Sequence, residues 1–493
     1  MNAVKTTKMT NYRWVICAML FLATTVNYMD RQVLSLTYPG EGGIQEEFGW
    51  TDENYGTITA YFSIVYAICM LFAGKFVDWM DTRKGYLWAI FVWSTGAVLH
   101  AFCGIATSGI LTGEWTIGFE AAKEHLVAFK AMGGLDAALA ISTTSVWLFL
   151  GARCVLALGE AGNFPAAIKV TAEYFPKKDR AFATAIFNSG ASVGALIAPF
   201  TIPVLAKFFG WEMAFVVIGA LGYVWMLLWV ILYKKPNKNP KVNAAELTYI
   251  NQDSEEKGDP KDAHDEGPNI SFLKCFGYKQ TWSFIVGKFM TDGVWWFFLF
   301  WTPAYLKSEF NINPTDVQGM VLIFVLYLIT MLSILGGKLP TYFINKGMNP
   351  YAGRMRAMLI FAFFPLLGMF AQPLGGVFGT PWFPIILIGI LGAAHQSWSA
   401  NIFSTIGDMF PKSTIATITG IGGMAGGIGS FLINKGAGTL FTYAEGQGEA
   451  FTFMGFDGKP AGYMIIFCIC AVAYLVGWCI MKTLVPKYKP IIA

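Results

Sequence analysis

The sequence has 493 residues, of which 55% are hydrophobic, 16% aromatic and only 13% charged, and its formal net charge is +4 at pH 7. So apolar a composition is typical of a chain that lies mostly in a lipid bilayer, and it excludes a soluble globular domain. The small positive charge reflects basic residues in a few loops rather than a basic surface, so we predict no nucleic-acid partner.

Apolar stretches long enough to cross a hydrocarbon core of roughly 30 Å recur along the chain. The first stretch is too long for a signal peptide and lacks a cleavage site of small residues, so we expect it to be retained as a span. The stretches predict an all-α membrane protein with twelve transmembrane helices, at about residues 14–36, 55–77, 86–107, 144–173, 182–208, 212–233, 282–306, 317–337, 355–373, 381–407, 414–440 and 462–482.

Basic residues gather in alternate loops between the predicted spans. Short loops with an excess of lysine and arginine stay in the cytoplasm, so this alternation predicts the orientation of the chain. The loop after the first span has the opposite character, with acidic residues and no basic residue between positions 37 and 54. We therefore expect both termini to be cytoplasmic and this loop to face the outside.

A polar stretch at residues 235–280 contains the string DSEEKGDPKDAHDEG and predicts a flexible cytoplasmic linker. It divides the chain into two six-helix bundles, residues 1–234 and 281–493. A repeat supports this division, because EYFPKKDRAFATAIFNSGASVG in the first half recurs as DMFPKSTIATITGIGGMAGG in the second.

The two halves differ by an insert. The string FPK recurs at an offset of 235 residues and the earlier pair GK at 263, so the first half carries 28 extra residues, near 108–135. The charge rule places this insert in the periplasm, and the apolar spacing of Phe119, Ala122, Leu126 and Phe129 predicts a short amphipathic helix. Both a lid and a membrane-surface or packing element fit this pattern.

Two parallel six-helix repeats are one architecture of secondary transporters, with the substrate site near the middle of the membrane. The sequence has no GxxxxGK[ST] string that would bind ATP, so uphill transport must draw on an ion gradient. We therefore expect a carrier for a small molecule.

Two adjacent charged residues, Asp30 and Arg31, lie deep in the first predicted span. A charge at that depth costs roughly 2.5 to 3.5 kcal/mol, so a partner must compensate it. Neighbouring residues on a helix point about 100° apart, which predicts different partners for the two side chains. A helix end with charges that reach the headgroups is the alternative, but the side chain of Asp30 is too short for this.

The fourth predicted span holds Arg153 and Glu160, seven residues apart and therefore on one face of a helix. Counting the rise from the ends of the spans places Arg153 and Asp30 at a similar depth, roughly 10 to 15 Å below the outer surface, so the two can pair. We predict that Asp30, Glu160 and Arg153 couple transport to protons. A static buried ion pair that fixes helix packing is the alternative.

Arg31 has no obvious carboxylate of its own in the first half, so its guanidinium is available for the carboxylate of a substrate. Aromatic and hydrogen-bonding side chains suit a polyhydroxylated anion, and packing is the alternative role for each of them. The acid Asp292 can pair with Lys288 one turn earlier, and we expect that pair to be structural or gating. Besides Arg31, the predicted substrate-binding residues are Tyr28, Tyr66, Asn188, Trp296, His395, Gln396 and Asn401.

Four strings, NYMDRQV, GEAGNFPAAIKVTAEYFPKKDRAFATAIFNSGASVGA, WWFFLFW and AHQSWSANIFSTIGDMFP, together resemble the anion:cation symporter branch of the major facilitator superfamily, most closely bacterial hexuronate transporters. The resemblance extends from about residue 11 to residue 488. It implies proton-coupled import of a sugar-acid anion, glucuronate or galacturonate, by alternating access in a bacterial inner membrane. We expect a monomer that needs no cofactor and no metal ion.

The resemblance also implies roles for single residues. The position of Arg31 contacts the substrate carboxylate in related carriers, those of Asp30 and Glu160 carry protons, and that of Arg153 interacts with these acids. Tyr28 and Tyr66 match tyrosines that contact a sugar acid in a relative.

The loop GKFVDWMDTRKGY after the second span resembles the loop signature of the superfamily and predicts a gating role for Gly74, Asp78 and Arg83. The chain departs from the family at three positions: Asp81 stands where glycine is usual, Trp79 where a basic residue is common, and Ala191 where a sugar-acid relative has glutamine.

The alternatives to a proton-coupled hexuronate symporter are a close variant of it, an intramembrane enzyme and a sensor. A close variant carries another organic anion, such as an aldonate or aldarate, or uses Na⁺. An intramembrane enzyme would need a metal-ligand cluster or a nucleophile with its base, and no such pattern occurs in the spans. A sensor would need a large soluble signalling domain, which the sequence lacks.

Overall fold

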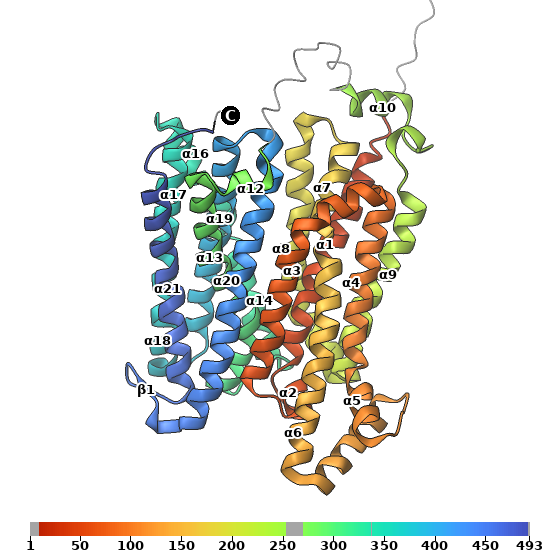
Figure 1. Cartoon of the computed structure of the whole chain (residues 1–493), viewed down its shortest axis with the longest axis vertical. Coiled ribbons are helices and arrows are strands. Elements are labelled where there is room, and N and C mark those ends of the chain that lie inside the picture. The colour runs from red at the N-terminus through yellow and green to blue at the C-terminus, as the bar shows by residue number, and fades with distance from the viewer. Residues whose placement is uncertain (1–8, 253–269, 337, 492–493) are drawn as a thin grey trace, which may run out of the picture.

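The computed structural model describes residues 9–252, 270–336 and 338–491. They form a bundle of long helices that run side by side along the longest axis of the molecule (Figure 1). The only strands in these ranges are β1 (Thr452–Phe453) and β2 (Phe456–Asp457), which pair antiparallel in a small hairpin. The predicted all-α class is therefore confirmed.

The helices of the first half are α1 (Arg13–Thr37), α2 (Ile44–Phe48), α3 (Asp52–Met80), α4 (Thr82–Ala101), α5 (Cys103–Thr112), α6 (Phe119–Glu160), α7 (Asn163–Tyr174), α8 (Lys177–Phe209) and α9 (Trp211–Leu232). The connection to the second half contains η1 (Pro236–Lys238), α10 (Ala244–Ile250) and α12 (Phe272–Cys275). The charged middle of the predicted linker, residues 253–269, lies outside the described residues.

The helices of the second half are α13 (Lys279–Phe310), α14 (Val317–Thr330), α15 (Ser333–Gly336), α16 (Lys338–Asn345), α17 (Pro350–Phe363), η4 (Phe364–Phe370), α18 (Ala371–Phe378), α19 (Trp382–Met409), α20 (Lys412–Gln447), η5 (Gly448–Ala450) and α21 (Lys459–Leu484). Figure 1 shows α10, α12 and the C-terminal end at one end of the bundle, which is called the linker end below. The opposite end carries α2 and the β hairpin and is called the insert end.

Eight helical segments of the described residues are long and apolar enough to cross a membrane, or nine if the pair α4 and α5, bent by 52°, counts as one span. The helices α1, α13 and α20 are also long, with 25, 32 and 36 residues, but lie outside this set. Nine spans and these three helices are consistent with the twelve spans predicted from the sequence. All three contribute residues to the cavity described below.

The repeated string FPK forms the same turn in both halves. Phe175 and Phe410 have extended backbones at the ends of α7 and α19, and Pro176 and Pro411 precede the first residues of α8 and α20. A residue before proline avoids the helical region, so each FP pair ends one helix and starts the next. The sequence repeat therefore encodes a structural repeat.

The fourth predicted span lies within one helical segment, Phe119–Tyr174, which is long and apolar enough to cross a membrane. Directly after Glu160, residues 161–162 separate α6 from α7 but keep right-handed helical angles. Two glycines bring this region against α4: a Cβ at Gly159 would lie 2.2 Å from the backbone nitrogen of Trp93, and one at Gly162 would lie 2.7 Å from the Cβ of Ala89. The end of α6 therefore lies closer to α4 than any larger residue at 159 allows.

The predicted amphipathic helix of the insert is present as residues 119–133, the first part of α6. It ends where Gly134 takes non-helical angles (φ 57°, ψ −130°). Ala122 and Leu126 are buried. Figure 1 shows this part of α6 near α5 at the insert end.

Charged groups tie the insert helix to the first half. Lys123 lies 3.1 Å from Glu212 at the start of α9 and 3.7 Å from Glu47 on α2. Burial raises the pKa of Glu47 to about 7, although Trp211 and Lys123 lower it. These contacts support a packing role for the insert.

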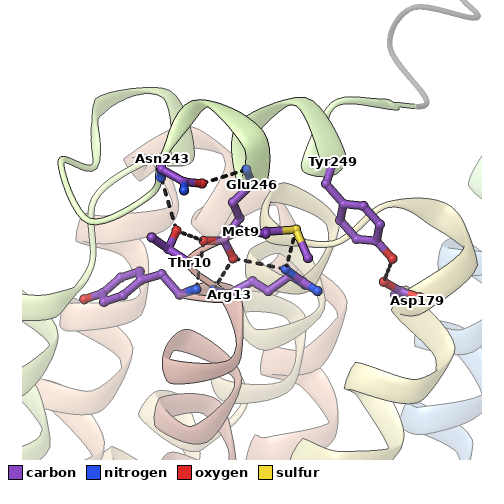
Figure 2. A network of polar contacts seen from close by, with 8 residues as sticks. Met9, Thr10, Arg13, Asp179, Asn243, Glu246 and Tyr249 are labelled. Carbon is purple, nitrogen blue, oxygen red and sulfur yellow. Dashed lines mark hydrogen bonds and ion pairs between the residues drawn. The ribbon is translucent and has the colours of Figure 1, made fainter. Parts of the chain in front are cut away.

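One buried carboxylate holds the short helix α10 against the start of α1 (Figure 2). Glu246 accepts hydrogen bonds from the backbone N–H groups of Tyr12 and Arg13 at 2.8 and 3.0 Å and from the Thr10 hydroxyl at 2.5 Å. It also pairs with the Arg13 guanidinium at 3.2 Å. The first N–H groups of a helix have no partner within it, so Glu246 caps α1 and joins the linker to it.

A second contact joins α10 to α8. The Tyr249 hydroxyl of α10 donates a hydrogen bond to Asp179 of α8 at 2.6 Å (Figure 2).

Burial raises the pKa of Glu246, but the hydrogen bonds from Arg13, Thr10 and Tyr12 outweigh this effect and hold the pKa below its usual value.

Replacing Glu246 by alanine is expected to destabilise the protein by about 3 to 5 kcal/mol, because Arg13 then stays buried without this partner. Since the pKa of Glu246 is lower in the folded state, its stabilisation is present above about pH 4.5 and is lost as the pH falls through the folded-state pKa. Thermal unfolding in detergent between pH 7 and 3 measures both effects. The exposed Thr248→Ala on the same helix is the control, and equal melting temperatures of the two variants would contradict the prediction.

Polar contacts close the gap between the two halves at the insert end. Lys459 pairs with Asp52 at 2.5 Å, and Lys435 pairs with Glu53 at 3.0 Å. The Tyr55 hydroxyl also donates to the backbone oxygen of Phe300 at 2.6 Å. Nearer the middle of the bundle, the hydroxyls of Ser63 and Ser430 lie 2.8 Å apart.

Candidate functional site

A cavity of about 340 Å³ lies between the two halves. Its first-half lining comes from α1, α3, α6, α7 and α8, and its second-half lining from α13, α19 and α20. The lining residues are Thr24, Asn27, Tyr28, Arg31, Tyr66, Met70, Glu160, Asn163, Phe164, Asn188, Lys288, Asp292, Trp295, Trp296, Leu299, His395, Gln396, Ser399, Phe403, Thr419, Gly423, Gly426 and Gly427.

An ion pair between Arg31 and Glu160 lies in the first-half wall of this cavity. The Arg31 Nε atom is 2.6 Å from the Glu160 Oε2 atom, and the two side chains are 8% and 0% exposed. The expectation that Arg31 has no carboxylate in the first half is therefore wrong. Depth along the helix axes did not reveal this pair, because depth does not tell which side chains of different helices face each other.

Three aromatic rings surround the guanidinium of Arg31. Its Cζ atom lies 4.7 Å from the centre of the Tyr66 ring, 5.1 Å from that of Tyr28 and 5.5 Å from that of Trp296. Such contacts stabilise a cation while they leave its N–H groups free to donate to an anion. Because Trp296 belongs to α13, Arg31 contacts both halves.

Asp30 does not pair with Arg153 in this structure. It is fully buried, and neither of its carboxylate oxygens has a hydrogen-bond partner among the described residues. Arg153 instead donates to the backbone oxygen of Arg31 at 3.1 Å, and its guanidinium lies 4.5 Å from the Phe62 ring centre. The predicted Asp30–Arg153 ion pair therefore does not form in this structure, and Arg153 instead contacts the backbone carbonyl of the residue after Asp30.

The second-half wall carries a further ion pair and a ring stack. Lys288 and Asp292 pair at 2.7 Å, as the sequence predicts, but they line the cavity. His395 stacks on Trp295 with ring centres 5.6 Å apart, and its Nδ1 atom lies 2.8 Å from the hydroxyl of Tyr474. The His395 ring therefore has a fixed orientation at the cavity wall.

Asn188 and Gln396 line the cavity as predicted, but Asn401 does not. Asn401 is buried, and its amide donates to the backbone oxygen of Ser397 one turn earlier on α19, at 2.8 Å. Asn401 is five positions after Gln396 and thus faces away from it, so the structure does not bring Asn401 together with the other predicted residues.

The predicted gating residues lie where α3 ends and α4 begins, with Gly74 and Asp78 in α3 and Arg83 in α4. Arg83 donates to the backbone oxygen of Val230 at 2.7 Å, and a Cβ at Gly74 would meet no atom within 4 Å. The side chain of Asp78 lies outside the described part of the structure. Asp81 has a positive φ of 67° and pairs with Lys235 at 2.8 Å. A positive φ favours glycine, which accounts for the usual family residue at this position.

Several lining residues were missed from the sequence, although helical spacing offered a signal for them. Thr24, Asn27 and Arg31 are spaced by three and four residues and share one face of α1. Asn163 follows Glu160 by three positions, which is also a helical spacing. Its side chain accepts a hydrogen bond from Tyr86 at 2.7 Å.

A two-half helical bundle around a central polar cavity defines the class of membrane carriers. The sequence matches the Major Facilitator Superfamily over residues 20–121 and 125–433. The chain belongs to this family. It is therefore a multi-pass membrane transporter and not an enzyme.

Sugar-acid transporters are among its relatives. The chain is 26% identical to the hexuronate transporter of Escherichia coli (strain K12), over 98% of this chain and 96% of that protein. It is 25% identical to the galacturonate transporter of Dickeya chrysanthemi, over 68% of this chain and 84% of that protein.

Solved structures share the fold. A bacterial homologue of the human lysosomal transporter Spinster, in an inward-facing and occupied conformation, has a TM-score of 0.63 and 18% identity, with 97% of each chain covered. A D-xylose-proton symporter has a TM-score of 0.63 and 15% identity, with 95% of this chain and 98% of that chain covered.

Proposed function

We propose that the protein is a proton-coupled symporter that imports a hexuronate, glucuronate or galacturonate, by alternating access. The observation that carries this proposal is the Arg31–Glu160 ion pair in the cavity wall. An arginine fork recognises a carboxylate, and an acid beside it is suited to carry a proton. The names of the hexuronate and galacturonate transporters among the relatives support this substrate class.

Competition for Arg31 couples the proton to the substrate. While Glu160 is ionised, its Oε2 atom pairs with the Nε atom of the Arg31 guanidinium at 2.6 Å. A proton on Glu160 removes its negative charge and weakens this contact, so the substrate carboxylate takes its place. Release of the proton on the other side restores the ion pair and expels the anion.

Asp30 provides a second proton position next to Arg31. A buried carboxyl group without a hydrogen-bond partner costs less as the neutral acid than as the carboxylate. Arg153 holds the backbone of Arg31 and thereby links this position to the substrate site. A change of charge at Asp30 therefore alters the electrostatics that the substrate meets one residue away.

Aromatic and amide groups of both halves bind the sugar part. Tyr28, Tyr66 and Trp296 offer ring faces to the C–H surface of a sugar, while Asn188 and Gln396 offer donors and acceptors to its hydroxyl groups. Since these residues come from α1, α3, α8, α13 and α19, substrate binding bridges the two halves.

We infer that the bundle is in an inward-facing state. Contacts such as Asp52–Lys459 close the insert end, which is the periplasmic end by the charge rule. We place the linker end and both termini in the cytoplasm of a bacterial cell, with the bundle in the inner membrane. Residues 1–234 and 281–493 then form the two moving halves of a monomer, and Gly74, Asp78 and Arg83 take part in the gate at the linker end.

Uptake into proteoliposomes tests this function. Labelled glucuronate is expected to accumulate above its outside concentration when the outside is more acidic, and not when only a Na⁺ gradient is imposed. Unlabelled galacturonate is expected to compete, and acetate is the control because it has the carboxylate without the sugar. Glucuronate uptake that ignores the proton gradient would reject proton coupling, and no uptake of either hexuronate would reject the substrate class.

A further inference from the structure

An ion pair in the second half lines the cavity but has no part in the proton and carboxylate sites proposed above. Lys288 and Asp292 lie one turn apart on α13, with the Lys288 Nζ atom 2.7 Å from the Asp292 Oδ2 atom. Their side chains are only 6% and 16% exposed. A buried ion pair is often no more stabilising than apolar residues of the same shape, so stability alone does not account for it.

Packing holds both charges at the cavity wall. The Lys288 ammonium lies 4.5 Å from the ring centre of Phe403, which also lines the cavity. The carboxylate of Asp292 lies against Gly426 on α20, where a Cβ would come within 2.3 Å of the Oδ2 atom. Both contacts leave the pair little freedom to turn away from the cavity.

The pair lies near the first-half site along α13. Trp296 follows Asp292 by four residues, which is about 6 Å of helix rise. The same Trp296 ring lies 5.5 Å from the guanidinium of Arg31. A sugar acid held at Arg31 therefore has its far end near Lys288 and Asp292, across the cavity.

The charges of the cavity are balanced in pairs. Its lining contains two cations, Arg31 and Lys288, and two carboxylates, Glu160 and Asp292. A substrate carboxylate that replaces Glu160 at Arg31 leaves the second pair intact. An intact pair presents one donor and one acceptor, which is what a hydroxyl group needs because it both donates and accepts. A second carboxylate would instead face Asp292 and repel it.

We propose that Lys288 and Asp292 form a second anchor, which binds the hydroxyl groups at the far end of the sugar acid and selects monocarboxylates over dicarboxylates of the same length. This inference rests on the proposed function of the cavity, and it names the part of the site that sets its specificity.

Binding to the purified protein tests this anchor with D-glucuronate and D-glucarate, which carry one and two carboxylates on a six-carbon chain. Trp295 and Trp296 line the cavity, so the change of tryptophan fluorescence measures each Kd. Asp292→Asn leaves Lys288 without its carboxylate and is expected to improve glucarate binding relative to glucuronate by about tenfold or more. Lys288→Met is expected to weaken glucuronate binding by about tenfold and to abolish glucarate binding. Lys307→Met, at the insert end of the same helix, is the control and should leave both values within about twofold.

The results separate this anchor from the proposed function. If the wild-type protein binds glucuronate and both variants keep the wild-type ratio of the two Kd values, the anchor is overturned and the proposed function stands. If the wild-type protein binds neither acid, the proposed function falls and the anchor with it. Should a single variant not fold, Lys288→Met combined with Asp292→Leu removes both charges together, and an unchanged glucuronate Kd in that double variant overturns the anchor.

Discussion

Replacing Arg31 by alanine is expected to raise the Kd of glucuronate at least about 100-fold, because charge-assisted hydrogen bonds are worth about 1.5 to 3 kcal/mol each and the guanidinium offers two to a carboxylate. The rings of Tyr28, Tyr66 and Trp296 also lose the cation that they surround. Arg31→Lys keeps the charge but not the planar fork, so a loss of about tenfold is expected. Calorimetric titration of the purified protein measures both values.

Controls separate a binding defect from a folding defect. Arg31→Ala leaves Glu160 buried without its partner, so Arg31→Ala combined with Glu160→Gln removes both charges and keeps the test valid if the single variant unfolds. Arg356 is an exposed arginine of α17, and Arg356→Ala should bind like the wild type. Wild-type affinity in Arg31→Lys would remove Arg31 from the carboxylate site.

Replacing Glu160 by glutamine is expected to abolish accumulation of glucuronate driven by a proton gradient while exchange of bound for free substrate continues. Glutamine mimics the protonated acid in size and charge, so Arg31 stays available at every pH. In the wild type, binding should strengthen as the pH falls, because more Glu160 is protonated and fewer Arg31 side chains are occupied. In Glu160→Gln the affinity should stay near the low-pH value of the wild type. Titrations at several pH values, together with uptake and exchange in proteoliposomes, measure these effects.

Glu449→Gln is the matched control, since Glu449 is an exposed acid of η5 outside the cavity. Gradient-driven accumulation by Glu160→Gln at the wild-type level would show that Glu160 is not the coupling acid. A wild-type affinity that does not change with pH would contradict the competition between Glu160 and the substrate, whatever the variant does.

The helices could be predicted because their signals are local. Apolar stretches of spanning length gave the twelve segments, and most of their ends lie within a few residues of the helix ends in the structure. The FPK repeat predicted two related halves, since proline restricts the residue before it and ends a helix in the same way each time. The bend of 52° between α4 and α5, at Phe102, was not predicted.

The site was predicted in its residues but only partly in its pairings. Most of the predicted substrate residues line the cavity, because polar and aromatic groups inside apolar spans are costly and therefore informative. The error concerned which groups meet: Glu160 is the partner of Arg31, Asp30 has none among the described residues, and Asn401 bonds to its own helix. The roles of these residues in transport stay predictions.

The sequence by itself determined that this chain is a membrane carrier of two related halves, with charged residues deep in its first span. It did so because spanning length, periodicity and the cost of buried charge are properties of single segments. Only the tertiary structure decided that Arg31 meets Glu160 and that Lys288 and Asp292 line the same cavity. A position along a helix fixes the depth of a side chain, but helix packing, set here by close approaches such as that of Gly159 to α4, decides which side chains at that depth touch.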